Sequence, residues 1–231
     1  MGNRVLAGVW VMAGLVLFGP ASARAGTEFN FWAQEDAWVN EGNAGANYGN
    51  NSYLSVKDRS GLSEAFIKFS PDDLRPLIGQ KILSASLWLY QYDYNYSPGD
   101  TVNARRAAAD WNEAAITWSN KPGVSADIAS TVNLIEGNDQ WRQWSGLEGV
   151  VASWVTGGAN YGLALENNAD MKSGELFSRF YSSEYADAGK RPYLQVQVSP
   201  HTAPEPVSMA LFMAGGGILG FSRMRKRTRS Q

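Results

Sequence analysis

The stretch KILSASLWLYQY, residues 81–92, decides the fold class because apolar and polar side chains alternate along it. Successive side chains of a β-strand point to opposite faces of the sheet, so a period of two predicts a strand with one buried face. The residues predicted to face the core are Leu83, Ala85, Leu87 and Leu89. The opposite face is predicted to carry Ser84, Ser86, Trp88 and Tyr90.

Three further stretches repeat this alternation on both sides of the first. They are YLSVKD at 53–58, EAFIKFS at 64–70 and YLQVQVS at 193–199. Clusters of Gly, Asn, Pro and Ser separate them, as in chains of short strands joined by turns. We therefore predict an all-β domain, an antiparallel β-sandwich over residues 26–199.

One segment follows a helical period instead. In SGLEGVVASWVTGG, residues 145–158, apolar residues recur at i, i+3, i+4, i+7 and i+8 from Leu147. That spacing places them on one face of a helix. Ser145 and Glu148 match a capping box, and Gly157 can end the helix in a left-handed conformation. We predict a short helix that lies across one end of the sandwich.

The N-terminal residues 1–25 have the features of a secretory signal peptide. Arg4 precedes a short apolar run at 5–18, and Ala23-Arg24-Ala25 provides a small-residue cleavage site. We expect cleavage after Ala25. The alternative is an uncleaved membrane anchor, but the run is short for a span of about 20 residues.

The C-terminal residues divide into three parts. A linker at 200–206 ends in Pro204-Glu205-Pro206, an apolar segment at 207–222 follows, and a basic tail at 223–231 ends the chain. A single apolar segment with a basic flank is typical of a membrane stop whose basic side stays in the cytoplasm. The order of the parts resembles the PEP-CTERM sorting signal. The resemblance implies transient membrane anchoring, processing by an exosortase, and export to the envelope or exterior of a Gram-negative type of cell.

The charge between these two ends argues against nucleic acid as a partner. Residues 26–204 hold 13 Lys and Arg against 21 Asp and Glu, a net charge of −8. Such a surface repels polyanions unless a bound cation reverses the local field. The chain has no cysteine, so an exported domain has to be held together by its core rather than by disulfides.

Four ordered stretches resemble one known family. They are DAWVNEGNAGANYGNNSYLSV (36–56), RAAADWNEAAITWSNKP (106–122), VVASWVTGGANYGLAL (150–165) and FSRFYSSEYADAGKRPYLQVQV (177–198). Together they resemble the DNRLRE domain, also described as carbohydrate-binding module family 96. The resemblance implies a jelly-roll-like β-sandwich in a secreted protein, with polysaccharide binding described for some members.

The second of these stretches holds Trp111 and Trp118, whose spacing alone would suit a helix. Its flanks follow the strand period, however, and Trp-Asn-Glu-x-x-Ile-Thr-Trp is the signature through which the chain most resembles the family. We predict that Trp111, Ile116 and Trp118 pack in the core around a structured turn. Asp110 and Glu113 are then expected to be turn and capping groups.

The candidate ligand-binding residues lie in LWLYQYDYNYSPGD, residues 87–100. An unbroken strand would place five aromatic side chains on the face opposite Leu87: Trp88, Tyr90, Tyr92, Tyr94 and Tyr96. Aromatic rings stack on the C–H faces of sugars, and Asp93 or Asn95 would supply polar orientation. The alternatives are that a second layer or a folded-back loop covers the rings, or that a bulge changes their parity.

Calcium is the cofactor to consider, because oxygen ligands are plentiful while His and Cys ligands are missing from the domain. The first candidate group is Asp93, Asn95, Ser97 and Asp100. The second candidate group is Asp36, Asn43 and Asn47. Turn-forming Asx residues are the ordinary explanation for either group, so no metal ligand is assigned.

Few residues suit catalysis. The single histidine, His201, falls in the linker, and without cysteine no ordinary catalytic triad can form. A glycosidase would need two carboxylates, for which the nominees are Asp110 with Glu113 or Glu166 with Glu184. The tyrosines would also suit a lyase that pairs Tyr with Arg or Lys.

The function predicted from these observations is non-catalytic binding of polysaccharide or exopolysaccharide by an exported β-sandwich. The alternative is a structural protein of the extracellular matrix or biofilm without a saccharide site of its own. A polysaccharide lyase or hydrolase ranks below both.

Overall fold

The computed structural model describes residues 26–58, 61–95, 101–133, 139–167 and 176–199. The predicted signal peptide, His201, the Pro204-Glu205-Pro206 motif, the apolar segment and the basic tail lie outside these ranges. Among the described residues, no helix has the length and apolarity needed to cross a membrane.

The described chain is built almost entirely of antiparallel strands. The strands are β1 (Thr27–Trp32), β2 (Glu35–Asn40), β3 (Tyr53–Asp58), β4 (Ser63–Lys68), β5 (Ile82–Asn95), β6 (Thr101–Ala107), β7 (Val124–Asn133), β8 (Gln140–Ser145), β9 (Leu163–Asn167), β10 (Leu176–Tyr181) and β11 (Tyr193–Val198). The helices are α1 (Glu148–Val155) and the short 3-10 turns η1 (Glu41–Asn43), η2 (Arg75–Leu77) and η3 (Ala188–Lys190). The all-β prediction is therefore confirmed.

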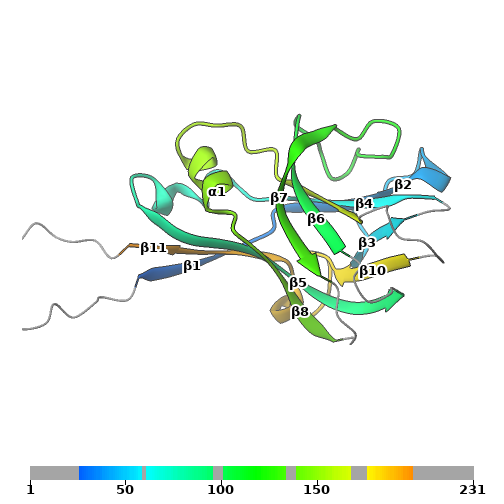
Figure 1. Cartoon of the computed structure of the whole chain (residues 1–231). Coiled ribbons are helices and arrows are strands. Elements are labelled where there is room, and N and C mark those ends of the chain that lie inside the picture. The colour runs from blue at the N-terminus through cyan, green and yellow to red at the C-terminus, as the bar shows by residue number, and fades with distance from the viewer. Residues whose placement is uncertain (1–25, 59–60, 96–100, 134–138, 168–175, 200–231) are drawn as a thin grey trace, which may run out of the picture.

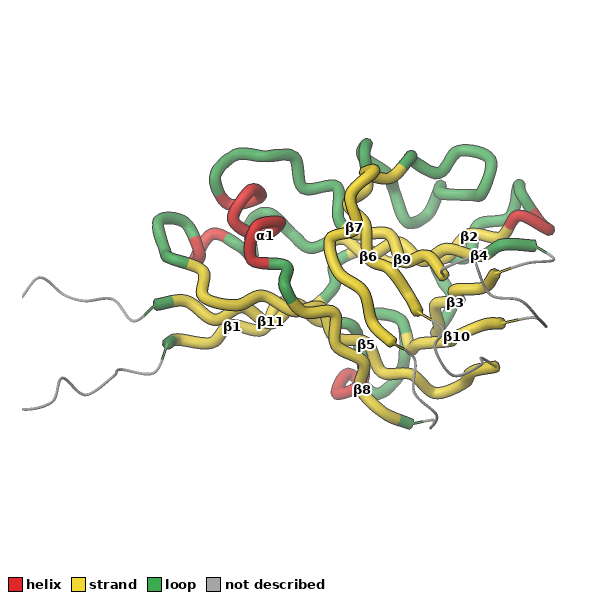
Figure 2. Tube along the Cα trace, in the orientation of Figure 1, coloured by secondary structure: helices red, strands yellow, loops and turns green. Residues whose placement is uncertain are grey.

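The strands form one sheet that curls into two layers (Figures 1 and 2). The first layer runs β1-β11-β5-β10-β3, with β11 along the start of β5, β10 along its end, and β8 on the other edge of β5. The second layer runs β4-β9-β6-β7, with β2 on the other edge of β4. The sheet bends between β3 and β4, which are joined by the single residue pair Lys57 and Ser63.

The main core lies between the two layers. Leu87 and Leu194 come from the first layer, Ile67 and Leu165 from the second, and all four side chains are fully buried. In β3, β4 and β11 the residues predicted to face the core are buried. In β11 the opposite face is half-exposed, as expected for a sheet with one face against a core, whereas in β4 Phe66 on the opposite face is buried as well. Those three predictions are confirmed.

One residue of the opening stretch lies on the face opposite to the predicted one. Leu83 is 43% exposed, although the alternation assigned it to the core. The pairing of β5 with β11 shifts between Gln197 and Val198, so a bulge on β5 reverses the parity at this point. Ile82 packs against the core in its place.

Helix α1 occupies the predicted segment but begins without the predicted cap. Ser145 ends β8, while Glu148 accepts a hydrogen bond from the backbone N–H of Ala85 in β5 at 3.3 Å and so ties the helix to the sheet. The predicted capping box is therefore wrong. Gly157 has a φ of +98°, which confirms the left-handed end. The buried residues at the inner face of the helix are Leu147, Val151 and Trp154.

A second, smaller core lies on the outer face of the second layer, under the segment at 108–123. Trp111 and Ile116 are buried there against Phe66 of β4, and Trp118 packs on the same cluster half-buried. The Trp111 indole N–H donates to the carbonyl oxygen of Tyr161 at 2.8 Å. The predicted packing role of this tryptophan motif is confirmed, and the segment explains why both faces of β4 are buried.

Candidate functional site

The outer face of the first layer carries an array of aromatic side chains. Directly opposed residues of antiparallel strands share a face, and the register opposes Tyr193 to both Trp32 and Trp88, and Trp141 to Tyr90. The set has members from six strands and is called the aromatic layer below. Its members are Trp32, Tyr53, Trp88, Tyr90, Tyr92, Trp141, Tyr181 and Tyr193.

Neighbouring rings of the aromatic layer contact one another across the strands. Trp141 meets Tyr193 at 5.2 Å and Tyr90 at 5.3 Å between ring centroids, both edge to face. Tyr90 stacks on Tyr181 at 5.8 Å, and Tyr181 stacks on Tyr92 at 4.6 Å. These are the offset and edge-to-face geometries that aromatic quadrupoles favour, so each ring fixes the orientation of the next.

One end of the aromatic layer is open. The Trp32 side chain is 50% exposed and lies 5.4 Å from the Tyr193 ring. Trp88 stacks parallel to Tyr193 at 6.1 Å with an interplanar angle of 6°. Trp88, Trp141 and Tyr193 are half-buried. The open end therefore presents indole and phenol surface that a flat apolar group could reach.

The other end is covered by the connection between β10 and β11. Tyr185 of this connection stacks on Tyr181 at 3.5 Å between ring centroids. The ammonium of Lys190, in η3, lies 4.7 Å from the centre of the Tyr90 ring, a distance typical of a cation–π contact. The alternative that a folded-back loop covers the predicted row thus holds for Tyr90, and the same connection covers Tyr181.

The predicted row of five aromatic residues on one face is wrong for Tyr94. The pairing of β5 with β10 shifts between Arg179 and Phe180, and beyond this bulge Tyr94 is opposed to the buried Ser178. Tyr94 therefore lies on the face opposite Tyr90, since an extra residue in one strand reverses the parity. Tyr96 lies outside the described residues.

The polar candidates next to the row differ in their surroundings. Asp93 is paired with Arg179, whose Nη1 donates to its Oδ2 at 2.8 Å, while Asn95 is exposed at the end of β5. The Arg179 guanidinium also lies 4.6 Å from the centre of the Phe177 ring. Burial raises the pKa of Tyr92 to about 12, so its hydroxyl stays a hydrogen-bond donor across the physiological range.

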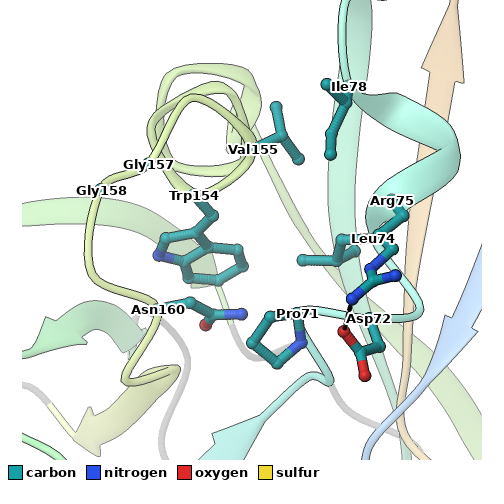
Figure 3. Close-up of a pocket in the computed structure, with 10 residues that line it drawn as sticks. All are labelled: Pro71, Asp72, Leu74, Arg75, Ile78, Trp154, Val155, Gly157, Gly158 and Asn160. Atoms are coloured by element: carbon teal, nitrogen blue, oxygen red, sulfur yellow. Dashed lines mark ion pairs between the residues drawn. The ribbon is translucent and has the colours of Figure 1, made fainter.

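A second concave region lies between η2 and the end of α1 (Figure 3). This open groove of about 400 Å³ is lined by apolar atoms of Leu74, Ile78 and Trp154. The polar side chains of the groove already have partners within the protein. Asp72 and Arg75 form an ion pair at 2.8 Å. The Asn160 amide donates to the carbonyl oxygen of Phe69 and accepts from the N–H of Gly162. Trp154 is only 8% exposed, so the groove offers little aromatic surface.

The carboxylates nominated for catalysis do not come together in the two nominated pairs, because each contacts other residues. Asp110 pairs with Lys68 at 3.2 Å, and Glu166 pairs with Arg105 at 2.9 Å. Glu113 and Glu184 instead lie together with Asp36. Neither nominated pair therefore has the two free carboxylates facing one substrate site that glycoside hydrolysis requires. Glu113 lies in the turn at 113–115, as expected, but the backbone N–H that its Oε1 accepts from, at 3.0 Å, belongs to the distant Asp36 in β2.

The second group considered for calcium, Asp36 with Asn43 and Asn47, does not come together either, because the two asparagines contact other residues. Asn47 forms an Asx turn with Gly49, as the ordinary explanation held, and its amide donates to the carbonyl oxygens of Glu113 and Ile116. Asn43 donates to the Tyr48 hydroxyl at 3.2 Å. In the first group Asp93 is committed to Arg179, while Ser97 and Asp100 lie outside the described residues.

Comparison with known proteins identifies the family. The model of carbohydrate-binding module family 96 matches residues 27–198. The chain belongs to carbohydrate-binding module family 96. This match covers every strand described above, including all eight members of the aromatic layer, so the layer is part of the family 96 module itself.

Curated relatives share part of this family 96 module. The "tRNA nuclease WapA" of Bacillus subtilis (strain 168) is 29% identical over 145 residues. The "tRNA3(Ser)-specific nuclease WapA" of Bacillus spizizenii is 29% identical over 143 residues. The match covers 59% of this chain but only 5% of each relative, so the chain spans a small fraction of the proteins it resembles.

Most of the aromatic layer of this family 96 module was not found from the sequence. A usable signal existed for Tyr193, which has the parity opposite to the buried Leu194 in the clearest strand of the chain. Trp141 alternates with the buried Arg142 and Trp144 in the same way. What the sequence could not supply is the strand order that sets these side chains beside Trp88.

Proposed function

We propose that this family 96 module binds polysaccharide without catalysing its cleavage, through the open end of the aromatic layer. The observation that carries the proposal is the group of rings around Trp32, Trp88 and Trp141. Part of their indole surface is exposed to solvent, and contacts with neighbouring rings hold them in a fixed orientation. Sugar rings present apolar C–H faces that stack on such surfaces, while hydroxyl groups bind polar side chains at the rim.

Polar groups suited to hydroxyl recognition line this end. Gln143 is opposed to Trp88, and Gln195 is opposed to Ser86, on the same outer face as the rings. Gln143 donates to the Ser86 hydroxyl at 3.0 Å, and Gln195 donates to Glu28 at 3.1 Å. Each amide keeps a carbonyl oxygen that can accept from a sugar hydroxyl.

The test is affinity electrophoresis of the chain through gels containing a panel of polysaccharides. We expect at least one polysaccharide to retard the protein. Trp32→Ala should weaken the binding about tenfold, since one stacked ring contributes on the order of 1 kcal/mol. The matched control is Ile128→Ala on β7, because Ile128 is 48% exposed and lies outside the aromatic layer. Equal losses in both variants would contradict the assignment.

A structural matrix role is the second candidate, and the covered end of the layer favours it. Tyr185 and Lys190 already occupy the faces that Tyr181 and Tyr90 would offer to a sugar. Lack of retardation on every gel would support this alternative. Release of reducing ends or of unsaturated sugar products would instead support a hydrolase or lyase.

The nuclease activity in the names of the Bacillus relatives is not extended to this chain. The shared part is 5% of each relative, and the net charge of −8 over residues 26–204 repels RNA.

The module is exported in this proposal, held transiently by the apolar segment at 207–222 and released to the envelope or matrix after exosortase processing. The sequence features of residues 1–25 and the Pro204-Glu205-Pro206 motif support this. Fractionation of cells that produce the chain tests it. Replacing the motif by three alanines should leave the unprocessed chain in the membrane fraction, whereas normal release would contradict the proposal.

A further inference from the structure

Three carboxylates from distant parts of the chain converge at the β2 edge of the second layer. Asp36 lies on β2, Glu113 belongs to the tryptophan motif, and Glu184 belongs to the connection between β10 and β11. One carboxylate oxygen of each residue lies within 4.8 Å of the other two.

Asp36 is the buried member of this group. Its side chain is fully buried, its Oδ2 accepts from the Ser183 N–H at 2.8 Å, and its Oδ1 accepts no hydrogen bond from a donor among the residues that the structure describes. A buried oxygen left without a partner destabilises a fold, and a buried carboxylate beside two others does so more. Burial, and next the nearby Glu184, raise the pKa of Asp36 well above its usual range.

Within the described ranges, no basic side chain forms an ion pair with Asp36, Glu113 or Glu184. The one ammonium close by, Lys68, lies 3.0 Å from Glu35 and 3.2 Å from Asp110, and it donates to the carbonyl oxygen of Trp111 at 2.7 Å. Lys68 thus makes its direct contacts outside the cluster, and its charge lowers the pKa of Glu113 by less than burial raises it. Three carboxylates therefore face one another without an ion pair of their own.

The backbone around the cluster is held in place by contacts that do not use the three carboxylates. The Asn47 amide donates to the carbonyl oxygens of Glu113 and Ile116, both at 2.7 Å. Ser182 donates to the carbonyl oxygen of Asn51 at 2.6 Å and accepts from the N–H of Glu184 at 3.1 Å. The convergence is thus built by the fold rather than by chance contact of exposed side chains.

We infer that Asp36, Glu113 and Glu184 bind a calcium ion. The donors are all hard carboxylate oxygens, which suit Ca²⁺ and Mg²⁺ rather than transition metals. Two oxygens bound to Ca²⁺ at about 2.4 Å lie at most roughly 4.8 Å apart, and the three donors lie within that limit, so one ion can reach all of them. Ca²⁺ is favoured over Mg²⁺ because it accepts irregular sets of protein oxygens, whereas Mg²⁺ demands near-ideal octahedral geometry. A divalent cation would give Asp36 Oδ1 a partner and offset the mutual repulsion.

The bound ion would also join three segments that are far apart in the sequence. It would link β2 and the tryptophan motif to the connection that carries Tyr185 over the aromatic layer. The calcium site does not depend on saccharide binding, and its test needs no saccharide.

The experiment measures thermal unfolding and titration calorimetry of the full-length chain after removal of metals with EDTA. Calcium at about 100 times its dissociation constant should raise the melting temperature by on the order of 5 °C, and calorimetry should give one site per chain. Equal melting temperatures with EDTA and with calcium, and no binding heat, would overturn the inference. A magnesium response as large as the calcium response would overturn the choice of calcium.

Two variants and a matched control sharpen the test. Asp36→Asn keeps an acceptor for Ser183 and removes the buried charge, so it should melt above the wild type in EDTA and lose the calcium response. Glu184→Gln removes an exposed ligand and should weaken calcium binding at least tenfold while leaving the fold intact. Glu28→Gln makes the same charge change on β1 and should bind calcium normally. A loss in Glu28→Gln equal to that in Glu184→Gln would overturn the site.

Discussion

Replacement of Trp111 by alanine tests whether the tryptophan motif forms a second core. Trp111 is 7% exposed, meets the Phe66 ring edge to face at 5.8 Å, and donates its indole N–H to Tyr161 at 2.8 Å. Truncation removes the buried ring and leaves a cavity, for which about 3 to 5 kcal/mol of unfolding free energy is expected. Trp111→Phe keeps an aromatic ring but leaves the Tyr161 carbonyl without its donor, at a cost of about 1 to 3 kcal/mol.

The assay is urea unfolding followed by fluorescence and circular dichroism, with the midpoint and slope compared between variants. Trp32→Ala is the control, because Trp32 is 50% exposed and its loss should cost less than about 1 kcal/mol. If Trp111→Ala costs no more than Trp32→Ala, the segment at 108–123 does not contribute a core. Trp118→Ala should fall between the two, since Trp118 is half-buried.

Tyr92, two glycines with positive φ and the bulge at Leu83 should each affect stability in a defined direction. The free energy of unfolding should fall as pH rises from about 10 towards 12, because the folded state keeps the Tyr92 proton after the unfolded chain has lost it. In urea midpoints measured against pH, Tyr92→Phe should show a smaller decline. Gly162→Ala should destabilise the fold far more than Gly79→Ala in thermal melts, since both have positive φ but only at Gly162 would the new Cβ meet backbone of β4. Leu83→Ser should change the urea midpoint little, whereas Leu87→Ser should lower it strongly, and similar effects would argue against the bulge that exposes Leu83.

The parts of the fold that are local in sequence were predictable. A period of two identifies β3, β4, β5 and β11, because a half-buried strand must alternate along its own length. The bulges at Leu83 and near Tyr94 were not predictable, since they depend on how β11 and β10 pair with β5. The capping box failed for a similar reason: the sheet, not the helix terminus, supplies the partner of Glu148.

The candidate sites depend even more on long-range contacts. The aromatic row on β5 was visible in the sequence, but its neighbours Trp32, Trp141 and Tyr193 reach it only through strand pairing. Asp36 was selected as an oxygen ligand with partners close in sequence, whereas the structure brings it Glu113 and Glu184 from far along the chain. Local spacing cannot indicate such groupings.

The most direct measurement of the central proposal is tryptophan oxidation footprinting by mass spectrometry, with and without a polysaccharide that retards the chain. The polysaccharide should strongly reduce the oxidation of Trp32. It should reduce the oxidation of Trp88 and Trp141 less, because these two side chains are half-buried already. Trp118, on the other layer, should be oxidised equally in both conditions. Binding that leaves Trp32, Trp88 and Trp141 unprotected would contradict the aromatic layer as the saccharide site, and protection of Trp154 instead would place the ligand in the groove beside α1.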